Sequence, residues 1–372
     1  MEKPPVIILS GVRWDFLWQR HHALATRFAR AGYPTVFVET TGLASPRRAR
    51  LGKVASRIRR AGEKRPSGEN GLSVYAPLAA PPTQRFFRWL NRRLFVGRVV
   101  EDLRKAVGPD PLIVVYPPTR TTLDLISGLQ PRLVLYDCSD DYENFPGVPK
   151  DIAATERELL QRADLVSCTS THLLRKVKPF RPDAFLSGPA VDYERFAVLQ
   201  DTSPAREVRT VCFFGHVSRE RIDFCALRLL AEAGFEVRLV GGLGRVDRDF
   251  LGTPRIDYRG EVPHAKLPAA LAGVDAFVLP YKINRLTRGI APAKTYECLA
   301  TGKPVVTAPL PAMEELAGYV HVAEEPEAYV EVLRSLDWLE TEERARARIE
   351  LARRNSWEAR FKEIEEALWH SL

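Results

Sequence analysis

The 372-residue sequence contains no run of about 18 apolar residues, which is the length that a membrane-spanning helix requires. The sequence therefore predicts no transmembrane helix. The first five residues lead directly into a short apolar stretch that begins at Val6. A secretory signal peptide has a longer apolar region that ends in a cleavage site, so we expect none here.

Cysteine is also scarce. The five cysteines are odd in number, scattered and placed mostly in apolar stretches, and they are Cys138, Cys168, Cys212, Cys225 and Cys298. No CxxC pair occurs, so the sequence predicts reduced cytosolic thiols and neither a disulfide framework nor a zinc site. The turn Gly11-Val12-Arg13 after the first apolar stretch lacks the GxGxxG pattern, which makes a dinucleotide site a weak interpretation.

Positive charge is concentrated in the first half of the chain. Residues 1–190 contain 30 Lys and Arg against 18 Asp and Glu, whereas residues 191–372 contain 25 against 29. The length allows two domains, each with its own core. A basic first half predicts contact with an anionic partner, and the candidates are anionic lipid, a lipid-diphosphate acceptor or nucleic acid.

Two segments within residues 43–105 carry much of this charge. Residues 43–65 hold nine Lys and Arg against one acid, Glu63. A connection of this length is usually functional or mobile, and we interpret it as a membrane contact. Residues 85–95 combine arginines with an apolar stripe at helical spacing. There we expect a crossover helix whose stripe packs on a sheet, with an anionic bilayer as the alternative.

The stretch from Ala276 to Ala308 predicts a strand, a polar loop, a helix and a second strand. The predicted strand Ala276–Leu279 ends at Pro280, and the helix is expected over residues 291–300. Pro292 suits a helical first turn, and Gly302 suits a helix C-terminus. The loop and the start of the helix are then expected at the carboxyl end of a parallel sheet, where open α/β sheets bind ligands.

The side chains of this stretch predict a phosphate site. A helix N-terminus attracts anions, and Arg285, Arg288 and Lys294 add positive charge around it. Glu297 follows Lys294 by about one turn, so both can lie on one face. Lys294 would hold a diphosphate and Glu297 would accept hydrogen bonds from a ribose diol. The alternative is a surface helix with an ordinary Lys–Glu pair.

These residues resemble the donor-site signature of GT-B glycosyltransferases, in the broad bacterial group 1 (family 4-like) enzymes of cell-surface polysaccharide biosynthesis. The motifs follow one another in the order found in that group: Pro280-Tyr281, Thr287-Arg288, Pro292-Ala293-Lys294 and the run from Glu297 to Val306. Two positions depart from the pattern. Cys298 replaces the usual aromatic residue, and Gly289 stands where many members carry an acid, so the two-glutamate version of the site is incomplete.

The resemblance implies an α/β fold of the GT-B type, with two Rossmann-like domains facing each other across a cleft. Residues 1–195 would form the acceptor-binding domain and residues 205–355 the nucleotide-sugar-binding domain. Residues 356–372 would form a terminal helix that crosses back to the first domain.

Several residues of the second half are expected at the donor. Thr210–Phe214 reads as a strand that ends in Gly215-His216, where glycine lets the backbone approach phosphate closely. The resemblance places the nucleobase against the loop that contains Val262. A plain surface loop is the alternative for residues 215–221. The expected donor residues are Gly215, His216, Arg219, Arg221, Gly241, Val262, Thr287, Arg288, Lys294 and Glu297.

The first half offers candidates for a general base. Asp137, Asp140 and Asp141 follow the predicted strand Arg132–Tyr136, and a partly shielded carboxylate can take a proton from an acceptor hydroxyl. N-caps or loop acids are the alternative. The expected catalytic residues are Asp140, Asp141, Arg288 and Lys294.

The head of the first helix, expected over residues 16–31, carries a further pair. The resemblance places Arg20 and His21 at the acceptor or the transferred sugar. The alternative is a surface arginine and a histidine with satisfied hydrogen bonds.

Together these features predict a metal-independent transferase. It would move a sugar from a nucleotide-diphosphate sugar of the UDP or GDP type to a lipid-linked or polysaccharide acceptor at the cytoplasmic membrane face. No cofactor, metal or nucleic acid is expected. Two other classes stay open. A nucleotide-sugar epimerase would isomerise the donor alone, and a nucleic-acid-binding protein would explain the basic first half but not residues 294–306.

Overall fold

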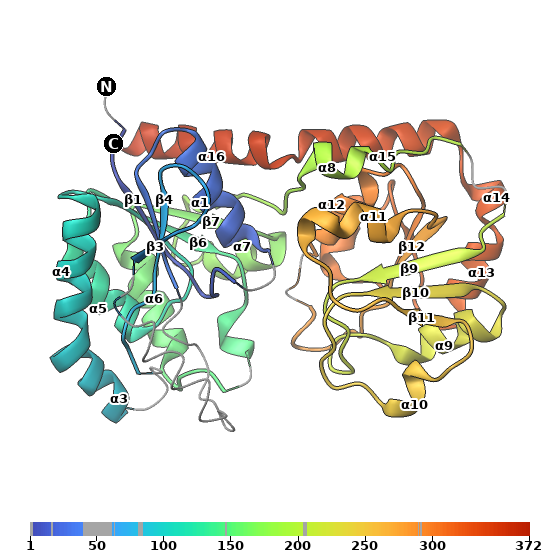
Figure 1. Cartoon of the computed structure of the whole chain (residues 1–372), viewed down its shortest axis with the longest axis horizontal. Coiled ribbons are helices and arrows are strands. Elements are labelled where there is room, and N and C mark those ends of the chain that lie inside the picture. Colours follow the sequence, from blue (N-terminus) through green and yellow to red (C-terminus); the bar gives the residue numbers. More distant parts are fainter. Residues whose placement is uncertain are drawn as a thin grey trace. The chain divides into compact units, whose positions relative to one another are not determined.

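The computed structural model describes residues 3–15, 18–39, 62, 64–80, 85–145, 147–203, 207–288, 290 and 292–372. The chain divides into two compact units, one of residues 1–187 and 361–372 and the other of residues 188–360. Each unit contains one largely parallel sheet with helices packed on it (Figure 1). Within the described residues, no helix is both long enough and apolar enough to cross a bilayer.

The first unit is built on an eight-stranded sheet with the strand order β3-β4-β2-β1-β5-β6-β7-β8. Seven strands run parallel, and β3 pairs antiparallel with β4. The central strands are buried throughout, as expected for a parallel sheet covered on both faces. The strands are β1 (Val6–Leu9), β2 (Thr35–Val38), β3 (Lys64–Pro66), β4 (Leu72–Tyr75), β5 (Leu112–Val115), β6 (Leu133–Cys138), β7 (Leu165–Cys168) and β8 (Phe185–Leu186).

The helices of the first unit include the end of the last helix of the chain. Phe361 packs edge-on against Phe28 with ring centroids 5.0 Å apart, and Glu365 accepts hydrogen bonds from Lys3 and Tyr33. The helices are α1 (Arg20–Arg30), α3 (Arg85–Leu90), the π-helix η1 (Asn91–Phe95), α4 (Val96–Val107), α5 (Arg120–Leu129), η2 (Tyr142–Asn144), α6 (Ile152–Arg162), α7 (Thr171–Val177) and α16 (Trp357–Ser371).

The helix predicted over residues 85–95 forms, but its expected packing is wrong. Phe86 is 62% exposed and Leu94 is 61% exposed, so the stripe does not pack on the sheet. Asn91 is fully buried in its place and binds the backbone of Ala80 through both side-chain ends. After the π-turn at η1, α4 covers the sheet with its own apolar residues. Most of residues 43–65 lies outside the described residues.

The second unit is built on six parallel strands in the order β11-β10-β9-β12-β13-β14. Strand β10 lies on one side of β9, and the chain later returns to place β12 on the other side of β9. This strand order makes the carboxyl ends of β9 and β12 a topological switch point, where such sheets bind ligands. The strands are β9 (Thr210–Phe214), β10 (Glu236–Val240), β11 (Ile256–Tyr258), β12 (Ala276–Leu279), β13 (Val305–Thr307) and β14 (His321–Val322).

The predicted strand, loop, helix and strand of residues 276–308 are confirmed as β12, α12 and β13. Helix α12 begins at Lys294, so Pro292 precedes the helix instead of lying in its first turn. Gly302 adopts the positive φ of +77° expected at a helix C-terminus. The helices of the second unit are α8 (Tyr193–Ala197), α9 (Phe224–Glu232), α10 (Arg248–Leu251), η3 (His264–Lys266), α11 (Leu267–Leu271), α12 (Lys294–Leu299), η4 (Pro311–Leu316), α13 (Ala328–Arg334), α14 (Leu336–Leu339), α15 (Glu342–Arg354) and the start of α16.

Candidate functional site

The loops that follow β9, β10 and β12 are joined by backbone hydrogen bonds. The amide of Val217 donates to the carbonyl of Gly242 at 2.9 Å, and the amide of Asp223 donates to that of Pro280 at 2.7 Å. These bonds hold three loops from different parts of the chain at one edge of the second sheet. A site at this edge is therefore assembled within the second unit alone.

Two predicted glycines meet at this edge. Gly215 has a φ of +122° and Gly241 a φ of +137°, and residues that carry a side chain rarely adopt either value. A Cβ built on Gly241 would lie 2.0 Å from the carbonyl oxygen of Gly215. The turns after β9 and β10 are thus in direct backbone contact, and this contact requires glycine at Gly241.

Lys294 lies against the turn that contains Gly215. A Cβ built on Gly215 would be 2.2 Å from Lys294 Nζ, and Nζ lies 4.4 Å from the centroid of the Phe213 ring and 5.6 Å from that of Tyr281. Among the described residues, no carboxylate lies within ion-pair distance of this ammonium group. Aromatic rings attract the cation but do not neutralise it, so the Lys294 ammonium group can accept an anionic partner.

His216 adds a neutral imidazole to this edge. Partial burial, followed by the charges of Arg221 and Lys294, lowers the pKa of His216 from its ordinary value. The ring lies beside the turn after β10, because a Cβ built on Gly244 would be 2.7 Å from His216 Nε2. The structure thus brings together five of the residues expected at the donor, namely Gly215, His216, Arg221, Gly241 and Lys294.

Arg219 takes a different direction from the other predicted cations. Its guanidinium forms an ion pair with Asp247 at 3.1 Å, and both side chains are about half exposed. An exposed pair of this kind contributes little stability and can exchange for a better partner. Arg219 therefore lies at the margin of the group around Lys294.

Thr287 shapes the loop after β12 instead of projecting from it. The residue is fully buried, and its hydroxyl donates to the carbonyl of Lys282 while accepting from the amide of Asn284 at 3.0 Å. Its expected contact with the donor is therefore corrected to a role in holding the loop. Arg285 and Arg288 project from the same loop and are exposed to solvent.

Glu297 does not pair with Lys294. Its carboxylate lies 2.9 Å from His264 Nε2, and the other ring nitrogen of His264 is hydrogen bonded to Arg195. The alternative of an ordinary Lys–Glu surface pair is therefore not found in the described structure. His264 and Arg195 are site residues that the sequence interpretation missed, because α8 and η3 are far from α12 in the chain.

The loop expected at the nucleobase lies next to the second glycine turn. The amide of Gly241 donates to the carbonyl of Gly260 at 2.8 Å, and the Tyr258 hydroxyl donates to the carbonyl of Gly241 at 2.9 Å. Val262 follows in this loop and is half-buried against the core of the second unit. Its main chain remains the proposed contact to the base.

In the first unit, Asp137 is not a candidate base. Strand β6 extends through this residue and buries it completely. Arg20 Nε donates to its carboxylate at 2.6 Å, and the Ser167 hydroxyl donates to it at 2.7 Å. Asp137 therefore neutralises a buried arginine, which corrects its expected place among three catalytic carboxylates.

The expected contact of Arg20 and His21 with the acceptor is also corrected. Arg20 is 9% exposed and His21 is 4% exposed. The His21 ring stacks on Tyr116 with centroids 3.5 Å apart, and its Nδ1 lies 2.9 Å from the Ser10 hydroxyl. Burial and the neighbouring His22 and Arg20 hold the pKa of His21 well below its usual value, as expected for a neutral packed ring.

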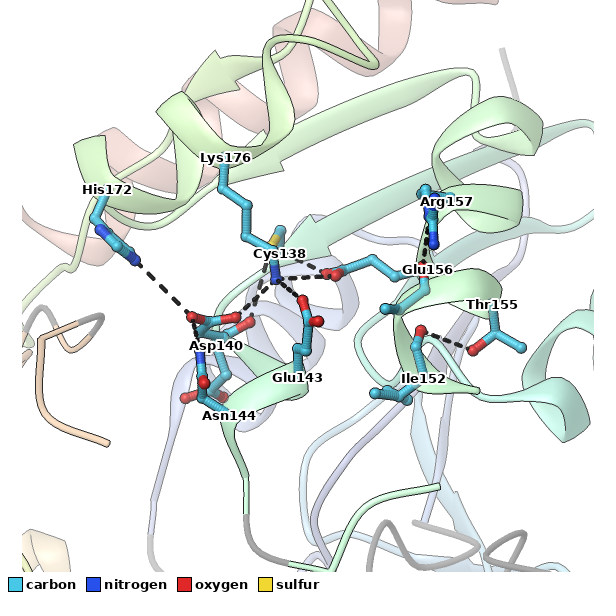
Figure 2. Close-up of polar contacts among 12 residues, drawn as sticks. Cys138, Asp140, Glu143, Asn144, Ile152, Thr155, Glu156, Arg157, His172 and Lys176 are labelled. Carbon is cyan, nitrogen blue, oxygen red and sulfur yellow. Dashed lines mark hydrogen bonds and ion pairs between the residues drawn. The ribbon is translucent and has the colours of Figure 1, made fainter. Parts of the chain in front are cut away.

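Figure 2 shows Lys176 together with Glu143 and Glu156, and Asp141 belongs to the same group of charges. Lys176 Nζ lies 2.7 Å from Asp141, 3.2 Å from Glu156 and 3.7 Å from Glu143. Burial alone would raise the pKa of Asp141, but hydrogen bonds from Lys176 and Asn144 outweigh it and lower that pKa. A carboxylate held in its charged form by a lysine is a weak base.

Asp140 directly precedes Asp141 in the segment between β6 and η2. Its side chain is half-buried, and the Ser139 hydroxyl lies 3.3 Å from one carboxylate oxygen. Asp140 (Figure 2) lies between the carboxyl end of β6 and the start of η2.

Comparison with known proteins places this geometry in a family context. Residues 219–366 match a family model described as "Glycosyl transferase-like". The chain is 25% identical over 270 residues to "Putative teichuronic acid biosynthesis glycosyltransferase TuaH" of Bacillus subtilis (strain 168). The match covers 62% of this chain and 65% of that relative, so the chain spans slightly less than two thirds of its length.

Solved structures match the chain over almost its full length. Anabaena Alr3699/HepE, crystallised in complex with UDP and glucose, is 15% identical with a TM-score of 0.64, covering 98% of this chain and 99% of that one. An alpha,alpha-trehalose-phosphate synthase (UDP-forming) from Burkholderia vietnamiensis is 11% identical with a TM-score of 0.68, covering 99% and 98%. At these identities the likeness shows a shared fold.

Proposed function

We propose that the chain is a GT-B glycosyltransferase of group 1, which transfers a sugar from a nucleotide-diphosphate sugar to a lipid-linked or polysaccharide acceptor; the match of residues 219–366 to a glycosyltransferase family model and the likeness to TuaH support this proposal. The transfer would take place at the cytoplasmic face of a membrane. In this proposal the second unit binds the donor and the first unit binds the acceptor.

The observation that carries the proposal is the position of Lys294. Its ammonium lies over Gly215 at the switch point of the second sheet, among aromatic rings and without a carboxylate partner in the described residues. A cation in such a place lacks a structural counter-charge, and a diphosphate would supply one. The neighbouring Arg221 would bind the same group.

The donor would be activated by charge stabilisation without a metal. As the bond to the sugar breaks, negative charge develops on the departing diphosphate, and preorganised cations stabilise it. Lys294 and Arg288 would have this role, with Arg219 joining them if its exposed pair with Asp247 opens. Glu297 would accept hydrogen bonds from the ribose, and Val262 would present its main chain to the base.

Asp140 would act as the general base on the acceptor. A base must be able to exchange its proton near neutral pH, and a partly shielded carboxylate such as the half-buried Asp140 at the carboxyl end of β6 can do so. Asp141 was an equal candidate from the sequence. Its ion pair with Lys176 supports a structural role for it, in holding η2 against α7.

The activity is tested by replacing Lys294. We expect Lys294→Ala to abolish release of nucleotide diphosphate from a panel of UDP and GDP sugars, while far-UV circular dichroism stays unchanged. Lys362→Ala, which removes an equal charge from an exposed position of α16, is the matched control. Undiminished turnover by Lys294→Ala would contradict the site. Isomerisation of the sugar in the absence of an acceptor would instead indicate an epimerase.

An exposed aromatic face supports the membrane part of the proposal. On α3 and η1, Phe86, Trp89 and Leu94 are each more than half exposed, and Arg85, Arg92 and Arg93 are exposed beside them. Clustered apolar side chains in water are unfavourable, whereas a bilayer interface can bury them. Each arginine near an anionic surface adds about 1 kcal/mol of attraction. We propose that this face, together with the basic residues 43–65, lies on anionic lipid.

Vesicle binding tests this contact. We expect the protein to sediment with phosphatidylglycerol vesicles at low salt and not with phosphatidylcholine vesicles. Trp89→Ser should weaken that partitioning about tenfold. Trp338→Ser is the matched control, since Trp338 is 85% exposed on α14 of the second unit, next to Asp337. Equal losses in both variants, or preferential salt-sensitive binding to duplex DNA, would contradict the proposal.

A further inference from the structure

Three side chains from separate segments form a hydrogen-bonded chain that ends at Glu297. Arg195 of α8 bonds to Nδ1 of His264, the first residue of η3, and Nε2 of the same ring lies 2.9 Å from Glu297 Oε1 on α12. Arg195 is held in turn by Asp192 at 3.0 Å. The His264 and Glu297 side chains are 18% and 15% exposed, so the contact is largely shielded from water.

The contact with Arg195 determines which nitrogen of His264 carries the proton. A guanidinium can only donate, so Nδ1 must accept and the ring proton lies on Nε2. That proton is donated to Glu297 Oε1. The Phe196 ring, 5.9 Å from the imidazole centroid, supports the same orientation from α8.

One hydrogen bond of this kind leaves the second carboxylate oxygen available. A carboxylate accepts at both oxygens, and no hydrogen bond to Glu297 Oε2 comes from the described residues. A donor on Oε1 fixes the rotation of the carboxylate, which would otherwise be free about its last bond. Oε2 is then presented in one direction, as a group that binds a diol requires.

We propose that His264 is a positioning residue that orients Glu297 toward the ribose diol of the nucleotide. This inference rests on the proposed function, because it takes the donor to be a nucleotide whose ribose meets Glu297. His264 itself contacts the carboxylate and not the ligand. Arg195 would act one step further away, by holding the tautomer that donates.

The test compares ribonucleotides with their 2′-deoxy forms. Calorimetry would measure binding of UDP, 2′-deoxy-UDP, GDP and 2′-deoxy-GDP to the full-length protein and its variants. We expect at least one ribonucleotide to bind the wild type about tenfold more tightly than its deoxy form, since a hydrogen bond from the 2′-hydroxyl to a charged acceptor is lost. Both His264→Ala and Glu297→Ala should reduce that ratio to within about threefold.

Two further variants separate positioning from simple structural support. His264→Gln places an amide N–H near the position of Nε2 and should restore most of the discrimination. Lys266→Ala, at an exposed residue of the same short helix, should leave the ratio unchanged. A purely structural role of His264 would weaken ribonucleotide and deoxynucleotide equally and keep their ratio.

The outcomes separate the role of His264 from the proposed function. If His264→Ala still prefers the ribonucleotide as strongly as the wild type does, the positioning role is overturned and the donor site is unaffected. Equal binding of the ribonucleotide and its 2′-deoxy form by the wild type would overturn the contact of Glu297 with the ribose diol. Failure of the wild type to bind either diphosphate would overturn the proposed donor site, and the inference with it.

Discussion

The ammonium group of Lys294 occupies the space that a side chain on Gly215 would need. A Cβ at Gly215 would lie 2.2 Å from Lys294 Nζ and 3.0 Å from its Cε. The two residues are 79 positions apart, so their contact cannot be predicted from the local sequence around either one. The glycine lets the lysine lie flat over the end of β9, among the rings of Phe213 and Tyr281.

Replacing Gly215 should therefore disturb the donor site through the lysine. We expect Gly215→Ala to lower nucleotide-diphosphate affinity at least tenfold, because the new methyl group displaces Lys294 from its position. The positive φ of Gly215 adds a strain of about 1–2 kcal/mol. Gly234→Ala is the matched control, since Gly234 has a φ of +103° with no atom within 4 Å of its Cβ position. We expect Gly234→Ala to lose about as much stability as Gly215→Ala and to bind nucleotide diphosphate as tightly as the wild type.

Donor binding should be linked to protonation of His216. Burial and the nearby cations hold the pKa of His216 below its ordinary value, and a bound diphosphate would raise that pKa. The added affinity is therefore present below the pKa of the free protein and is lost as pH rises through the pKa of the complex. Calorimetry between pH 6 and 8 should show proton uptake on binding. His216→Ala should show only the titration of the ligand, and an unchanged profile would contradict the prediction.

The two aspartates after β6 should respond differently to the same change. We expect Asp140→Asn to reduce the rate of sugar transfer by a factor of about 10² to 10⁴, the usual contribution of a general base. Asp141→Asn should retain turnover within about tenfold but lower the stability of the first unit, because Lys176 loses its closest partner. Initial rates and thermal unfolding measure the two effects. The reverse order of rates would assign the base to Asp141.

A buried ion pair should make the second unit sensitive to acid. Glu340 binds Arg348, which is 1% exposed, and His321 at 2.6 Å. Burial would raise the pKa of Glu340, but hydrogen bonds from His321 and Arg348 outweigh it and lower that pKa. Its stabilisation is therefore present above the unfolded pKa of about 4.3 and is lost as pH falls through the folded pKa.

Removing that charge should destabilise the unit at neutral pH as well. We expect Glu340→Gln to cost about 3–5 kcal/mol, because it leaves the Arg348 guanidinium buried without a counter-charge. Glu342→Gln, which breaks an exposed pair with Arg346, should cost at most about 0.5 kcal/mol. Hydrogen exchange in β12 and β13 during a urea titration measures both. Equal costs would show that the buried pair contributes nothing beyond a surface one.

Local sequence patterns predicted the elements of the second unit closely. Strand β9 has the predicted bounds, since its apolar run ends at Gly215, which breaks the strand. The start of α12 was predicted three residues too early. Proline suits a helical first turn but does not require one, and here Pro292 precedes the helix.

The first unit shows where such patterns fail. A run of three acids after an apolar stretch looks alike whether or not each acid is buried. Asp137 cannot act as a base, because it is paired with Arg20, which lies 117 positions earlier in the chain. The apolar stripe of α3 is likewise compatible with a sheet or a bilayer, and burial of Asn91 decides which side faces water.

The sequence by itself determined the alternation of strands and helices, the glycine turns and the positions of Lys294 and Glu297 on one short helix. These features depend on residues within a few positions of each other, which is the range over which backbone preference and periodicity act. Only the tertiary structure decided the partners of these side chains. Lys294 meets Gly215 and Glu297 meets His264 because parallel strands place the ends of distant segments at one edge, and contacts across such distances leave no local pattern.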